Sequence, residues 1–185
     1  FSAHPLKNLN AYGDSGYMTT NDYSIYKKAK SMRNHGLVNR NIVKQFGFLS
    51  RMDVLQAGIL NYRIKNLQNI INQRRKNANF YLKNLDREKY FLIDEKKYQF
   101  NTYHTFVIQV KNREKLINFL KRNNIGTAIH YPIPIHLQPA SKYLGYKKND
   151  FPETEKQSKR ILTLPIHQNL KISDLKKIVK KLNQF

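Results

Sequence analysis

Cysteine is absent from this chain of 185 residues, and long apolar segments are absent too. Without cysteine the chain can form no disulfide and no thiolate metal site, which is typical of a cytoplasmic protein. No apolar run comes near the roughly eighteen residues that a membrane-spanning helix needs. The hydrophobic content is 40%, which is adequate for the packed core of a globular fold.

Acidic residues are scarce, since 12 Asp and Glu stand against 34 Lys and Arg, and the formal net charge is +22. Such a charge favours a polyanionic partner: nucleic acid, an anionic membrane surface or a phosphate-bearing small substrate. The lysines are spread along the predicted helices among many Asn and Ile residues, which indicates a compositional bias more than one binding stripe. A basic nucleic-acid-binding module without enzyme activity stays open as the alternative, and its binding would weaken steeply with salt.

Turn and helix signals divide the first part of the chain into short elements. Paired glycines tolerate positive φ, and Asp favours both turns and helix N-caps. The predicted order is a strand end at 2–5, a turn at 13–16, a return strand at 17–20, a helix capped by Asn21-Asp22 and closed by Gly36, and a loop at 39–48.

Apolar residues recur at steps of three and four from residue 52 to residue 85, with Arg74 as an interruption. We expect one long helix there, begun by the capping-box-like Ser50-x-x-Asp53 and packed on a core or a dimer partner. Alternation at 103–110 predicts a strand that carries His104 on its apolar face. The later predicted elements are a helix at 111–124, a strand at 125–131 that completes a β-α-β module, an extended proline-rich connection at 132–139, and helices at 153–161 and 173–182, the last capped by Ser173-Asp174.

Lys7 lies between the first strand end and the glycine-bracketed turn. An amine held in this way is less free than that of a surface lysine, and a held, partly desolvated amine is what Schiff-base chemistry requires. The string around it resembles the active-site segment of the DegT/DnrJ/StrS sugar-nucleotide aminotransferases, through Ser2, His4, Pro5, Lys7, Leu9, Gly13, Asp14 and Gly16. Three later motifs follow in the order of that family: Arg33-Asn34-His35-Gly36, then Ser50-Arg51-Met52-Asp53-Val54-Leu55-Gln56-Ala57, then His130-Tyr131-Pro132-Ile133-Pro134-Ile135-His136-Leu137-Gln138.

The resemblance implies an α/β fold, the C-terminal part of a fold-type-I pyridoxal-phosphate (PLP) transferase. Residues 1–60 would be the remnant of the large-domain sheet, and residues 61–185 a small α/β C-terminal domain reached through the long helix. Family members carry their phosphate loop and the aspartate for the pyridine nitrogen upstream of the lysine. We therefore expect this chain to be the C-terminal half of a longer protein and to be inactive alone.

The activity implied by the resemblance is amino transfer from a donor such as glutamate to a nucleotide-linked keto-sugar, as in polysaccharide biosynthesis. A homodimer with shared active sites is implied too, and we expect neither a membrane nor nucleic acid as partner. Lys7 would be the catalytic Schiff-base lysine, and Ser2 and His4 would join it in binding PLP. The alternatives for these two are an ordinary strand serine and a packed histidine.

The implied substrate contacts are His130, Tyr131, His136 and Gln138 in the segment 130–138, and His104 on the strand predicted at 103–110. Core packing is the alternative for His104. No metal is expected, because no carboxylate or cysteine stands at a supporting spacing from the histidines of the loop. Lys7 argues against the sugar dehydratases of the family, which have histidine in its place. Leu49 stands where many members have an asparagine that reaches the cofactor phosphate of the partner, and leucine cannot donate that hydrogen bond.

Overall fold

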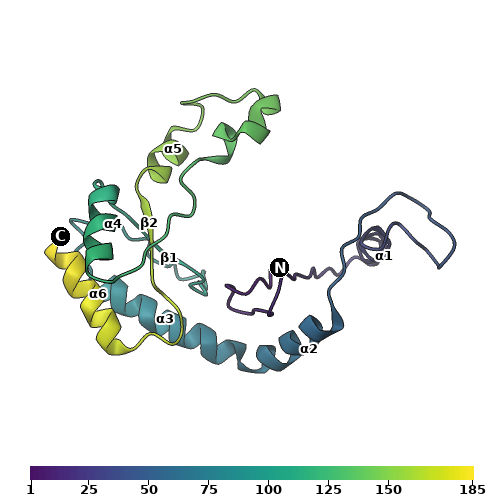
Figure 1. Cartoon of the computed structure of the whole chain (residues 1–185), viewed down its shortest axis with the longest axis horizontal. Coiled ribbons are helices and arrows are strands. Elements are labelled where there is room, and N and C mark those ends of the chain that lie inside the picture. The colour runs from purple at the N-terminus through teal and green to yellow at the C-terminus, as the bar shows by residue number, and fades with distance from the viewer. The chain divides into compact units, whose positions relative to one another are not determined.

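The computed structural model describes residues 1–185 as a mixed α/β chain with two compact units, Phe1–Gln68 and Asn69–Phe185. Figure 1 labels its main elements. The helices are α1 (Tyr23–Met32), α2 (Val54–Arg63), α3 (Leu67–Asn84), α4 (Arg113–Arg122), α5 (Pro152–Ser158) and α6 (Ile172–Gln184), and the strands are β1 (Phe106–Gln109) and β2 (Ile161–Leu164). Three 3-10 turns complete the list: η1 (Ile64–Asn66), η2 (Ile135–Leu137) and η3 (Pro139–Leu144). No helix combines the length and the apolar composition that crossing a bilayer demands.

The beginning of the first unit is a folded loop rather than a pair of strands. Ala3 donates its N–H to Ser15 O at 2.8 Å, and its carbonyl accepts from Ala11 N–H at 2.9 Å. Ser2 and Gly16 form only an isolated antiparallel bridge. The strands predicted at 2–5 and 17–20 therefore do not form, because pairing between the two segments does not extend beyond the vicinity of this bridge.

Helix α1 follows the prediction closely. Asp22 is its N-cap, and Asp22 Oδ1 accepts from the N–H groups of Ser24 (2.7 Å) and Ile25 (3.2 Å). The helix ends at Met32, and Gly36 then adopts a φ of +74°, the left-handed conformation that glycine tolerates best. The loop predicted at 39–48 is confirmed, since this stretch contains no helix or strand.

The predicted long helix is present with one interruption. Helices α2 and α3 are joined by the 3-10 turn η1, so the helical stretch runs from residue 54 to residue 84. The predicted capping box is wrong, because Asp53 is the N-cap and makes no side-chain capping bond. Arg74, which the sequence marked as an interruption of the apolar face, is only 7% exposed.

The second unit is built on an antiparallel sheet that differs from the predicted β-α-β module. Strand β1 pairs with β2 from Phe106↔Leu164 to Gln109↔Ile161. The strand predicted at 125–131 is reduced to a single bridge, Ala128↔Thr163, and β2 occupies the position beside β1. The helix predicted to reach residue 161 ends at Ser158, so the apolar run that follows it is free to pair as a strand.

The core of the second unit lies on one side of this sheet. Helices α3, α4 and α6 gather around the two strands (Figure 1), and fully or nearly fully buried side chains from all of them meet there. The largest of these are Tyr81, Tyr90, Ile108, Leu116, Leu120, Leu162, Leu164 and Leu182. The predicted inward face of α6 is confirmed, but the helix begins at Ile172, with Lys171 as N-cap in place of the predicted Ser173-Asp174.

Candidate active site

The Lys7 segment is a turn held by short local hydrogen bonds. Lys7 donates its backbone N–H to His4 O at 2.8 Å, and Asn10 Nδ2 donates to Pro5 O at 2.7 Å. The His4 Nδ1 atom accepts from Leu6 N–H at 3.2 Å. Lys7 itself is half-buried. The backbone from which the lysine side chain extends is therefore fixed on both sides of the residue.

Ser2 and His4, the two other predicted cofactor ligands, belong to the same loop. Ser2 Oγ accepts from His4 N–H at 3.4 Å, and His4 Nε2 lies 3.8 Å from Asp14 Oδ1. The His4 and Asp14 side chains are 47% and 96% exposed, so their attraction is strongly screened by water. The structure thus brings Ser2, His4 and Lys7 together within one short loop.

A cavity in the first unit is lined by none of these three residues. It has a volume of about 1160 Å³ and is lined by the segment that follows the turn, by α1 and by residues 50–52. Its basic residues are Lys30, Arg33 and Arg51. Arg33 Nε donates to Ser50 O at 3.0 Å, which ties α1 to the segment that leads into α2.

In the second unit, His130 and Tyr131 share a groove of about 420 Å³. His130 Nδ1 lies 2.9 Å from Thr163 Oγ1 of β2, which fixes one face of the imidazole. The Tyr131 ring meets the His130 ring edge-on, with 5.4 Å between ring centroids, and Tyr131 is 73% exposed. These two predicted substrate contacts are accessible from solvent.

The remaining three predicted substrate contacts do not line this groove. Gln138 Nε2 donates to Ile133 O at 3.4 Å. His136 Nε2 lies 3.1 Å from Glu155 Oε1, and the two side chains are only 8% and 9% exposed. Burial acts to raise the pKa of Glu155, but hydrogen bonds from His136 and from Asn149 N–H outweigh burial, and the net shift of this pKa is downward.

His104 lies before β1, where Arg74 holds the backbone. Arg74 Nη1 donates to Tyr103 O and to His104 O, both at 3.2 Å, and Arg74 Nε donates to Gln168 Oε1 at 3.1 Å. Burial lowers the pKa of Arg74. His104 is half-buried. The strand predicted at 103–110 would have contained it, but β1 begins only at Phe106, so His104 lies just before the strand.

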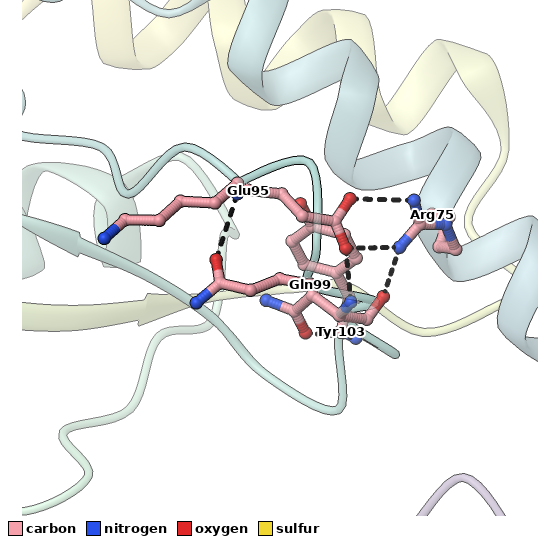
Figure 2. A network of polar contacts seen from close by, with 6 residues as sticks. Arg75, Glu95, Gln99 and Tyr103 are labelled. Carbon is pink, nitrogen blue, oxygen red and sulfur yellow. Dashed lines mark hydrogen bonds and ion pairs between the residues drawn. The ribbon is translucent and has the colours of Figure 1, made fainter.

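Sequence reasoning did not identify the polar network that Figure 2 shows beside this segment. Arg75 makes two 2.8 Å hydrogen bonds to the two carboxylate oxygens of Glu95 and a third, 2.7 Å long, to Asn101 O. The guanidinium also lies 4.4 Å from the ring centroid of Phe100. The hydrogen bonds from Arg75, assisted by one from Asn101 N–H, lower the pKa of Glu95 to about 2. No local signal marks this pair, because its members lie 20 residues apart.

Solved structures that share this fold are aminotransferases. The S. venezuelae enzyme DesV, solved in complex with a ketimine intermediate, superposes with a TM-score of 0.95 at 28% identity, over 100% of this chain and 50% of that chain. The predicted fold class, the C-terminal part of a fold-type-I transferase, is confirmed. The chain belongs to the DegT/DnrJ/EryC1/StrS aminotransferase family, whose sequence pattern matches residues 1–183.

Two relatives illustrate the range of this family. The chain is 36% identical over 188 residues to the pleiotropic regulatory protein of Geobacillus stearothermophilus, covering 100% of this chain and 50% of the relative. It is 34% identical over 172 residues to the dTDP-3-amino-3,6-dideoxy-alpha-D-galactopyranose transaminase of Aneurinibacillus thermoaerophilus, covering 92% of this chain and 46% of the relative. The chain thus spans about half the length of the curated relatives that it matches. These likenesses do not favour the alternative of a nucleic-acid-binding module.

Proposed function

We propose that this chain is the C-terminal portion of a PLP-dependent enzyme that transfers an amino group from a donor such as glutamate to a nucleotide-linked keto-sugar. The observation that carries the proposal is Lys7 in a backbone-held turn, within a chain whose family is one of aminotransferases. The 34% sequence identity to a dTDP-sugar transaminase supports a nucleotide-linked sugar as the substrate class.

The donor set of the Lys7 loop fits the cofactor. It offers a primary amine for an aldehyde, a hydroxyl from Ser2 for a phosphate oxygen, and an imidazole from His4. PLP, when bound, supplies an electron sink for the carbon that loses or gains a proton. The Lys7 amine would hold the cofactor in the resting enzyme and then carry that proton as general base and acid. Ser2 would orient the phosphate through its hydroxyl.

We further propose that substrate recognition rests on the second unit. His130 and Tyr131 present an imidazole and a phenol at an open groove, and such groups hydrogen-bond the hydroxyls of a hexose or the oxygens of a diphosphate. Gln138 and His104 are proposed as additional contacts on the strength of the family motifs alone.

A homodimer with shared sites is part of the same proposal. The first unit exposes many large apolar side chains, which supports cover by a partner surface, from a second subunit as well as from the rest of the full-length protein. Leu49, at the position of the usual asparagine, is one of them at 64% exposure. Others are Val38 (54%), Ile42 (55%), Phe46 (98%) and Phe48 (71%).

The test is to trap the cofactor on its lysine in the full-length protein. Borohydride reduction after incubation with PLP, followed by peptide mapping, should leave the pyridoxyl group on Lys7. Lys7→Ala should lose both the adduct and amino transfer, whereas Lys28→Ala, at an exposed lysine of α1, should keep both. A reducible adduct retained in Lys7→Ala would refute the assignment. Residues 1–185 alone should show no turnover.

A further inference from the structure

The stretch from Gly126 to Arg160, here called the excursion, leaves the sheet after α4 and returns to it at β2. It carries η2, η3 and α5. Its buried residues are Ser141, Glu155 and Ser158, and all three are polar. Apart from Ile129, which is partly buried, its large apolar residues are exposed instead, among them Tyr131, Ile135 and Tyr143.

This distribution is the reverse of an ordinary core, where apolar groups are buried and polar groups face water. Hydrophobic burial supplies most of the free energy that holds a folded segment together. The excursion has no fully buried apolar side chain. Near its start Ile129 packs on the core and Ala128 pairs with Thr163 of β2, and beyond these two anchors its conformation depends on a small number of polar contacts.

Glu155 is the centre of those contacts. Glu155 Oε1 lies 3.1 Å from His136 Nε2 and accepts from Asn149 N–H at 2.6 Å. The His136 ring packs on Phe151, with 4.8 Å between centroids, and Phe151 meets Tyr146 at 5.1 Å. One carboxylate therefore ties together η2, the loop before α5 and α5 itself.

We propose that His136 is a positioning residue that acts through Glu155. The pair locks the excursion in the conformation that presents His130 and Tyr131 at the groove, and His136 does not touch the substrate. The enclosure of its side chain, with 8% exposure, and the engagement of Nε2 by the carboxylate carry this assignment. This positioning role differs from the direct substrate contact that the sequence predicts for His136. The effect of the role on sugar binding rests on the proposed function.

Removing the imidazole should open the excursion without unfolding the rest of the second unit. In His136→Ala the enclosed Glu155 carboxylate loses a hydrogen-bond donor, and a buried charge without its partner is strongly destabilising. Of the excursion, only Ile129, near its start, packs against the core around β1, β2, α3, α4 and α6, and no excursion residue is among the buried members of that core. Opening should therefore be local, since segments with few buried apolar contacts open independently of the core.

Hydrogen exchange on the full-length protein without substrate tests the lock directly. His136→Ala and Glu155→Ala should speed amide exchange within the excursion by roughly 10-fold or more and leave α3, α4 and α6 unchanged. Glu153→Gln is the matched control, because its side chain is 72% exposed on the same helix. Unchanged exchange in His136→Ala, or an equal increase throughout the second unit, would overturn the proposal.

The two half-reactions separate positioning from direct contact. We expect His136→Ala to raise KM for the keto-sugar by the factor by which it lowers the closed fraction of the excursion, with the glutamate half-reaction unaffected. His136→Gln, which restores an N–H donor, should recover both properties in part. A raised KM with unchanged exchange would make His136 a direct substrate contact and refute its positioning role. Absence of amino transfer in the unaltered protein would instead refute the proposed function, while the exchange result would still decide the lock.

Discussion

Replacing Arg74 with methionine tests whether an enclosed guanidinium organises the backbone before β1. Methionine keeps much of the length and the apolar stem but has no donor, so Tyr103 O and His104 O each lose a hydrogen bond of 3.2 Å. A buried acceptor left unsatisfied costs about 1–3 kcal/mol. Tyr103 O is buried, whereas His104 O is part-buried and can turn to water, so we expect a loss of about 1–3 kcal/mol in the local free energy of unfolding. Gln168 adds little, because it is half-buried and its side chain can turn toward water.

The assay is hydrogen exchange of the amides from residue 103 through β1 in the full-length protein. A loss of about 1–3 kcal/mol corresponds to exchange faster by roughly 5-fold to 160-fold, provided that local opening limits exchange. Lys76→Met is the matched control, because Lys76 is exposed on the same helix and the substitution removes the same charge. If the amides from residue 103 through β1 exchange at the same rate in Arg74→Met as in Lys76→Met, the guanidinium does not hold this backbone and the reasoning is wrong.

Two further predictions concern the Arg75–Glu95 pair and a glycine. Arg75 lowers the pKa of Glu95 to about 2 from 4.5, so the stability that the pair contributes is present above pH 4.5 and is lost as the pH falls toward 2. Exchange at 95–103, corrected for its intrinsic rate, should rise over that window, and Glu95→Gln should abolish this rise. Gly36→Ala should lower the thermal midpoint, because its Cβ would lie 1.5 Å from Gln45 O, whereas Gly126→Ala, with nothing within 4 Å, should not; equal midpoints would contradict this.

Elements with a long apolar period could be predicted from the sequence, even where the signal for the helix start was misleading. Helix α6 is an example, because Leu175, Ile178, Val179 and Leu182 fall on one face and all are buried. Strand β2 could not be predicted in the same way. Its four residues, Ile161–Leu164, form a short apolar run directly after a helix, and periodicity cannot distinguish a buried strand from a helix end at that length.

Hydrogen bonds from a side chain to backbone far along the sequence also could not be predicted. In the sequence Arg74 looks like an interruption of an apolar face, since arginine is rarely buried. Its partners lie 29, 30 and 94 residues away, so no local pattern shows that its charge is satisfied. The apolar period of α3 continues through Arg74 because the guanidinium finds acceptors at the edge of the core.

The histidine loop shows why similarity and structure give different information about a site. The family motif places His130 and His136 in one loop of candidate substrate contacts, and the two residues are the same chemical type. Only the contacts separate them, because His130 is exposed beside a groove whereas the side chain of His136 is 8% exposed against Glu155. Since a ligand can reach only the first without opening the excursion, burial supports the proposal that His130 contacts the substrate and that His136 positions the loop.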